Sequence, residues 1–314
     1  MARLMTLCAR RLTRTLGPVA VRLHDWPGDI GPAGASLPLR LAGGLHYLAR
    51  AGDPGLAAAW PPRPAEDEAI WSATCTALDR HAAFLLDWLD SPPQTNEAGR
   101  MAALLAMALA AVDAHPLPVE WLEVGASAGL NMHVDRVALS AGGWRRGARP
   151  AAISLAPDWT GPPPIDRLVR ITSRRGCDIR PVTDPQRLHA YLWPDQPGRA
   201  ERTDALLALP RPQVDAASAD LWLEARLARP AAGRLRVVAH TVAWQYFPTA
   251  VATRAAAVIE DAGRRATPEA PLARIAMEAD GGRGAGLTLT LWPGGRARAM
   301  GRADFHGRWV DWTG

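Results

Sequence analysis

The sequence predicts an α/β protein in two parts, an all-helical part over residues 1–117 and a mostly parallel sheet with an antiparallel hairpin at its edge over residues 118–314. Two observations carry this prediction. Apolar residues recur at helical spacing up to Pro118, and strand and helix patterns alternate after it. With 314 residues, of which 48% are hydrophobic, the chain is long enough to form the cores of two domains.

The amino-terminal part contains several helical stretches separated by prolines. Residues 1–20 carry four arginines among apolar residues, which indicates an amphipathic helix rather than a signal peptide, and we expect a cytoplasmic protein. Apolar spacing predicts three further helices, which cover residues 37–51, 66–89 and 97–114. Thr95 or Asn96 can cap the last of them.

The carboxyl-terminal part alternates strands with helices. The predicted strands are 119–124, 168–172, 213–216, 235–241 and 272–278, and the hairpin pairs 287–292 with 297–302 across a Pro-Gly-Gly turn. Predicted helices cover 129–139, 184–193, 199–209, 219–228 and 248–262. A Gly/Pro-rich excursion spans 142–164, and no helix fits between the fifth strand and the hairpin.

Composition excludes several kinds of chemistry. Three distant cysteines and eight histidines offer no disulfide framework and no metal-ligand spacing, so no metal is predicted. All 36 basic residues are arginine, which excludes a lysine Schiff base and a Walker-type lysine. Despite the net charge of +5, the arginines are scattered, and we expect no nucleic-acid partner. No apolar run approaches the ~20 residues of a membrane span.

The strongest candidate for a binding site is the turn from Glu123 to Gly129, between the first predicted strand and the helix after it. Gly125 lets the chain bend, the small Ala126 and Ser127 let backbone amides approach a ligand, and Gly129 permits close packing of the next helix. A helix N-terminus here would favour an anionic or polar group. The alternative is a turn that binds nothing.

Three residues near the end of the fourth predicted strand are candidates for catalysis. His240 lies at the carboxyl end of that strand, where a neutral imidazole can act as general base or can simply bond a neighbouring carbonyl. Gln245 and Tyr246 follow and can contact a planar ligand or pack. From the helical part, Asn96 and Glu97 can reach the site or serve only as caps.

An acidic residue followed by Gly-x-x-x-Gly resembles motif I of S-adenosylmethionine-dependent methyltransferases. Several stretches also resemble an uncharacterised bacterial family, domain of unknown function 2332 (DUF2332), from about residue 37 to the carboxyl end. They are Gln94-Thr95-Asn96-Glu97, Leu122 to Asn131, Arg175-Gly176-Cys177-Asp178, Trp193-Pro194-Asp195-Gln196 and Val242-Ala243-Trp244-Gln245-Tyr246. The resemblance implies a Rossmann-like, methyltransferase-type sheet.

The same resemblance implies roles for the site residues. Glu123 through Gly129 would surround the methionine and ribose of S-adenosylmethionine, with Asn131 orienting the loop. Asp178 would hold the ribose hydroxyls, although it lies several residues beyond the predicted second strand. Ser218 occupies the place where methyltransferases have an acidic residue for the adenine amino group, which puts that contact in doubt.

The expected function is therefore S-adenosylmethionine-dependent methyl transfer to a small molecule, with His240 deprotonating or orienting the acceptor. One alternative is a non-catalytic ligand-binding protein of the same fold. Another is a nicotinamide-dependent oxidoreductase, which the missing Gly-x-Gly-x-x-Gly disfavours. The absence of Asn/Asp-Pro-Pro-Tyr after the fourth strand argues against methylation of nucleobase amines. The acceptor and the oligomeric state do not follow from the sequence.

Overall fold

The computed structural model describes residues 2–31, 34–61 and 63–314. The chain forms two compact units, one of Met1–Thr95 with Asp184–Ala200 and the other of Asn96–Thr183 with Glu201–Gly314. The predicted domain boundary at residue 117 thus does not coincide with the division between these units, and it stays a prediction.

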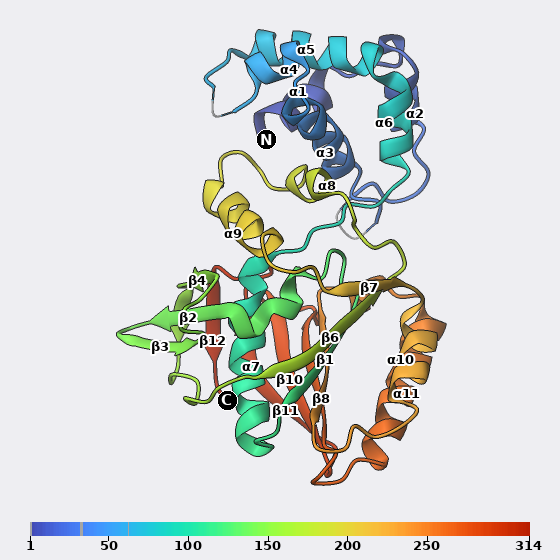
Figure 1. Ribbon diagram of the computed structural model, residues 1–314. Coiled ribbons are helices and arrows are strands. Elements are labelled where there is room, and N and C mark those ends of the chain that lie inside the picture. Colours follow the sequence, from blue (N-terminus) through green and yellow to red (C-terminus); the bar gives the residue numbers. More distant parts are fainter. Residues whose placement is uncertain (1, 32–33, 62) are drawn as a thin grey trace. The chain divides into compact units, whose positions relative to one another are not determined.

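Helices build the described part of the first unit (Figure 1). They are α1 (Ala2–Arg11), α2 (Pro18–His24), α3 (Leu37–Arg50), α4 (Pro54–Ala59), α5 (Asp67–Arg80), α6 (Ala82–Leu89) and α8 (Pro185–His189), while α9 (Pro197–Leu207) runs across the division. Leucines such as Leu41, Leu45 and Leu78 form its core. The single helix predicted over 66–89 is broken at His81, whose φ of −110° is not helical and whose Nε2 lies 2.9 Å from Asp53 Oδ2.

The second unit begins with the segment Asn96–Arg100 and the buried helix α7 (Met101–Ala114). Residues 98–100 form a 3₁₀ turn, so the helix predicted from residue 97 starts later. Eleven of its fourteen residues are buried, as its Ala, Leu and Met content predicts. It packs against strands of the large sheet.

The large sheet has nine strands in the order β5-β12-β11-β10-β9-β8-β1-β6-β7. Its parallel part consists of β1 (Val119–Val124), β6 (Ile171–Asp178), β7 (Gln213–Ala216), β8 (Leu235–Thr241) and β9 (Leu272–Ala279). The hairpin of β10 (Ala285–Trp292) and β11 (Arg296–Ala303) is antiparallel, and β12 (Trp309–Trp312) and β5 (Asp158–Thr160) complete the edge. The predicted mixed α/β architecture with a mostly parallel sheet is confirmed.

Two predicted elements are wrong in ways that matter for the site. The helix predicted at 129–139 is a 3₁₀ helix (Leu130–Arg136) followed by β2 (Val137–Ala141), because the Gly142-Gly143 turn returns the chain as β3 (Trp144–Gly147). Together with β4 (Ile153–Leu155), these strands form a small second sheet within the predicted excursion. The second strand of the large sheet, predicted at 168–172, is β6 and runs on to Asp178.

The two faces of the large sheet carry different side chains. Leu122 and Val124 pack with residues of α10 (Ala219–Leu227) and α11 (Thr249–Arg264) in one hydrophobic cluster. Successive side chains of a strand point to opposite faces, so Glu123 points to the other face. The strand order reverses between β1 and β8, and ligands of open α/β sheets bind beyond the carboxyl ends of strands at such a point.

Candidate functional site

The loop after β1 is held in left-handed backbone conformations. Gly125, Ser127 and Gly129 have φ values of 68°, 54° and 79°. A Cβ atom on Gly125 would lie 2.4 Å from the Cβ of Ala243, in the loop after β8. Both the positive φ and this close approach therefore require a residue without a side chain at Gly125.

The loop does not lead into an α-helix. The seven-residue 3₁₀ helix that follows it is too short and too irregular to concentrate a helix dipole at the turn. The α-helix N-terminus expected to favour an anionic or polar group therefore does not follow the loop. Any affinity of the loop for a ligand has to come from its own backbone and side chains.

Two side chains from other segments fix the loop. Asp178, at the carboxyl end of the adjacent strand β6, accepts a hydrogen bond from the backbone N–H of Ser127 at 2.9 Å. Asn96 Oδ1 accepts one from the N–H of Leu130, also at 2.9 Å. Asn96 thus contacts the loop, and Asp178 ends its strand instead of lying beyond it.

Three buried oxygen atoms of this region have no hydrogen-bond partner within the described residues. They are Oε2 of Glu123, Oγ of Ser127 and Oδ1 of Asn131, and their residues are 2%, 6% and 2% exposed. A buried polar atom without a partner costs about 1–3 kcal/mol, and such atoms are uncommon in folded proteins. Polar groups of a ligand or an ordered water molecule would satisfy them.

The carboxyl group of Glu123 is the most unusual of these groups. Burial is the main reason that its pKa is raised to about 8; the Trp121 indole and the Arg100 guanidinium oppose the rise, and the Asp178 carboxylate makes a smaller contribution to it. Nε1 of Trp121 forms no hydrogen bond, so this indole does not satisfy the carboxyl oxygen. Below about pH 8, Glu123 is mainly a neutral acid.

His240 lies in a different environment. Its Nδ1 is 2.7 Å from Glu278 Oε1, and its Nε2 accepts a hydrogen bond of 3.0 Å from Arg274. The side chain is 1% exposed, and burial lowers its pKa although Glu278 opposes this. In the parallel register Ala239 is paired with Glu123, so His240 points to the opposite face of the sheet.

Glu278 also accepts hydrogen bonds from the backbone N–H groups of Ala243 and Trp244, so this carboxylate holds the loop after β8 together. Both ring nitrogens of His240 are engaged in that arrangement. The geometry favours a structural histidine, one of the two roles that the sequence left open. Its catalytic role stays an untested prediction.

The remaining predicted site residues are spread more widely. Gln245 and Tyr246 lie exposed on the short 3₁₀ helix after β8, and Tyr246 is 65% exposed. Ser218 precedes α10 and its hydroxyl donates to the carboxylate of Asp220. Ala126 is buried, and its N–H donates to the carbonyl of Cys177 on β6.

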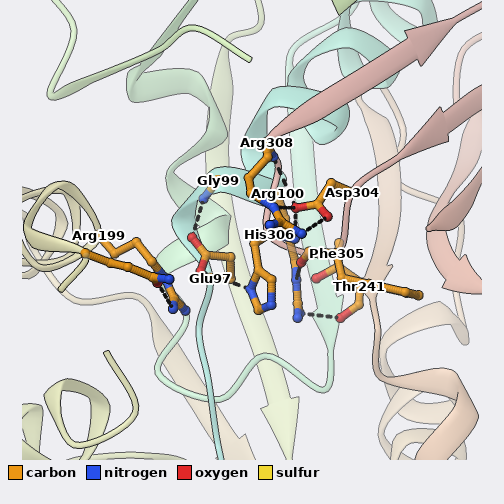
Figure 2. Close-up of polar contacts among 10 residues, drawn as sticks. Glu97, Gly99, Arg100, Arg199, Thr241, Asp304, Phe305, His306 and Arg308 are labelled. Atoms are coloured by element: carbon orange, nitrogen blue, oxygen red, sulfur yellow. Dashed lines mark hydrogen bonds and ion pairs between the residues drawn. The ribbon is translucent and has the colours of Figure 1, made fainter. Parts of the chain in front are cut away.

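A third loop meets the first two, and sequence reasoning missed it. It is the turn Asp304–Arg308 after β11, a strand that runs in the same direction as β1 and β8. Arg100 donates to the carbonyls of Phe305 and Thr241, at 2.9 and 3.1 Å, and so ties this turn to the end of β8 (Figure 2). The sequence feature that could have drawn attention to this turn is His306, a histidine shortly after the last hairpin strand.

The comparisons with known proteins identify the family. Residues 1–312 match the family described as an uncharacterized protein conserved in bacteria (DUF2332). The chain belongs to this family. The match includes the amino-terminal residues before position 37, which the predicted resemblance left out. No curated protein and no solved structure matches the chain.

Of the stretches that resemble DUF2332, Trp193-Pro194-Asp195-Gln196 lies in the first unit, and residues of three others meet around the loop after β1 in the second unit. Asn96 bonds the loop after β1, and Asp178 bonds it from β6. Ala243 packs against Gly125 from the loop after β8. The described residues contain no group of three His, Cys, Asp or Glu side chains arranged for a metal ion. None of the described helices is long and apolar enough to cross a membrane.

Proposed function

We propose that this protein is an S-adenosylmethionine-dependent methyltransferase that acts on a small molecule. The observation that carries the proposal is the loop of Glu123 to Asn131, with its three unsatisfied buried oxygens, at the point where the strand order of the sheet reverses. S-adenosylmethionine bound at this loop would supply an electrophilic methyl group attached to its sulfonium sulfur.

The topology supports the proposal. In chain order the five parallel strands are β1, β6, β7, β8 and β9, and they lie in space as β7-β6-β1-β8-β9. This is the order 3-2-1-4-5 of doubly wound sheets, which places the loop after the first strand beside the loop after the fourth. The antiparallel hairpin then replaces the further strand-helix unit of common methyltransferases.

The chemistry of the unsatisfied atoms also supports it. A carboxyl, a hydroxyl and an amide oxygen can all accept hydrogen bonds, so the site suits a ligand rich in donors or positive charge. The methionine end of S-adenosylmethionine carries an ammonium and a sulfonium. Glu123 and Asn131 would face the ammonium, and Asp178 would lie beside the ribose hydroxyls from the end of β6.

The contribution of the protein to the reaction would be mainly alignment. Methyl transfer needs the acceptor held in line with the methyl group, and correct orientation alone can lower a barrier by about 7–11 kcal/mol. The cross-linked loops after β1, β8 and β11 give the rigid frame that such alignment requires. Both ring nitrogens of His240 are already hydrogen-bonded, so we assign His240 no role in the proposed reaction.

Isothermal titration calorimetry of the full chain with S-adenosylmethionine, S-adenosylhomocysteine and NAD tests the proposal. We expect the first two to bind and NAD not to. Binding of neither would refute the methyltransferase and leave a protein for another ligand, while binding of NAD alone would support the oxidoreductase.

The variants should probe the loop without unfolding it. Ser127→Ala removes only the unsatisfied hydroxyl and should weaken binding about 5- to 10-fold, the value of one ordinary hydrogen bond. Ser154→Ala, at an exposed position on β4, is the matched control and should bind as the parent does. Substitution of Gly125 is a poor probe, because any side chain there displaces Ala243.

A further inference from the structure

A half-exposed histidine lies against a buried carboxylate at the meeting point of the three loops. Nδ1 of His306 is 3.4 Å from Oε2 of Glu97. The Glu97 side chain is 2% exposed, whereas that of His306 is 48% exposed. Figure 2 shows the His306 ring beside the Glu97 carboxylate. About half of the His306 side chain is therefore exposed, while Nδ1 is the ring nitrogen that faces Glu97.

The backbone around this pair is held tightly. Glu97 Oε1 accepts a hydrogen bond of 3.0 Å from the N–H of Gly99. A Cβ atom on Gly99 would lie 2.1 Å from the carbonyl oxygen of His306, so the two segments touch through their backbones. Asp304 accepts the N–H of His306 and also pairs with Arg308. The histidine therefore sits on a fixed support although its ring is exposed.

The pair also lies at the proposed binding site. Asn96, next to Glu97, bonds the loop after β1, and Arg100 bonds both the end of β8 and Phe305, next to His306. Arg100 is close enough to Glu123 to influence its pKa. Within the described part of the second unit, the contacts place Glu97 against the His306 ring and Asp304, Arg308 and Arg100 on the turn that carries it.

We propose that His306 is the general base for the methyl acceptor and that Glu97 is the positioning residue that orients it. This inference rests on the proposed function. Nε2 of His306 accepts the proton of an O–H or N–H group as that bond breaks, and the electron pair stays on the acceptor atom, which becomes the nucleophile. Glu97 stabilises the resulting imidazolium through the Nδ1–H group, and the proton then passes from Nε2 to water.

This assignment narrows the substrate class. An imidazole base is useful only for an acceptor that loses a proton, so the acceptor would be a neutral hydroxyl or nitrogen N–H compound. His306 takes the role that the sequence suggested for His240, whose two ring nitrogens are already bonded. A half-exposed imidazole whose Nδ1 faces a buried carboxylate is a geometry that suits a general base.

The test compares the affinities of S-adenosylmethionine and S-adenosylhomocysteine, which differ by the positive sulfonium, by calorimetry between pH 5.5 and 7.5. A positive charge on His306 near the site repels the sulfonium, so the affinity for S-adenosylmethionine relative to that for S-adenosylhomocysteine should fall as the pH is lowered in the parent protein. His306→Gln should abolish this dependence, and His115→Gln, which lies before β1 in the same unit, should retain it. In Glu97→Gln the amide can also donate to Nδ1, so ¹⁵N NMR of the neutral His306 ring should show less proton occupancy on Nδ1 than in the parent protein.

The outcomes separate the two proposals. If neither ligand binds, the methyltransferase proposal itself fails. If both ligands bind but the ratio of their affinities does not change with pH, the proposed function stands and the assignment of His306 as general base is wrong. The same conclusion follows if His306→Gln keeps the pH dependence of that ratio. An unchanged Nδ1 proton occupancy of His306 in Glu97→Gln would overturn the positioning role of Glu97.

Discussion

The ionisation of Glu123 provides the sharpest prediction about stability. Burial raises its pKa from 4.5 to about 8. Below pH 4.5 the carboxyl is neutral in the folded and the unfolded chain and has no effect on the balance between them. Between pH 4.5 and about pH 8 the unfolded chain loses the proton and the folded chain keeps it, so the stability of the fold decreases as the pH rises.

Above about pH 8 the folded protein also carries the buried charge, and the full cost applies. Each unit of pKa difference corresponds to about 1.36 kcal/mol, so the cost is on the order of 5 kcal/mol. Glu123→Gln removes the ionisation and keeps the shape of the side chain. The variant should therefore be several kcal/mol more stable than the parent at pH 9, relative to the difference between them at pH 5.

Urea unfolding of both proteins, followed by far-ultraviolet circular dichroism from pH 5 to pH 9, measures this difference. Glu269→Gln, at an exposed position of the same unit, makes the same change of net charge and should show no such trend. NMR of protein with ¹³C-labelled glutamate carboxyl groups should show one resonance that titrates near pH 8 and is missing in Glu123→Gln. A stability difference that does not change with pH would refute the reasoning.

Three other variants test the frame of the site. Gly125→Ala should destabilise the protein by about 2–4 kcal/mol in urea unfolding, because it combines a positive φ with a clash against the loop after β8. The control Gly233→Ala has a similar φ but open space around it, and it should cost only about 1–2 kcal/mol. Asn96→Leu should cost about 1–3 kcal/mol and weaken binding of S-adenosylmethionine, because it leaves the N–H of Leu130 unbonded. Asn96→Asp keeps the acceptor and should lose less; equal losses would mean that this bond is unimportant. His240→Gln should lower stability by about 1–3 kcal/mol and leave the Kd for S-adenosylmethionine within about twofold, and a much larger loss of binding would restore a direct role for His240.

Much of the fold could be predicted because the apolar pattern repeats with the period of the element. β1, β7, β8, β9 and both strands of the hairpin lie within one or two residues of their predicted limits. The errors came from segments where tertiary contacts override local pattern. Residues 130–136 have the composition of a helix. The next residues pair as β2 in the small sheet, so the segment before them forms only a 3₁₀ helix.

In the candidate site, too, local sequence pattern predicts some features and tertiary contacts decide the others. Spacing alone drew attention to Glu123, Gly125 and Ser127, because a strand followed by small residues is a local feature. The pairing of His306 with Glu97 joins residues more than two hundred positions apart and has no local signal. The sealing of His240 depends on Arg274 and Glu278, which reach it only through the register of β8 with β9.

The sequence by itself determined the class of the fold, the position of the loop after the first strand and the membership of a bacterial family, since these depend on residue types at short spacing. Only the tertiary structure decided which of the polar groups are satisfied. Hydrogen bonds satisfy both nitrogens of His240, whereas three oxygens of the loop have no partner in the part of the chain that the structure describes. The reason is physical: whether a buried polar group is satisfied depends on which other segments the fold brings within about 3 Å of it, and no local pattern specifies that.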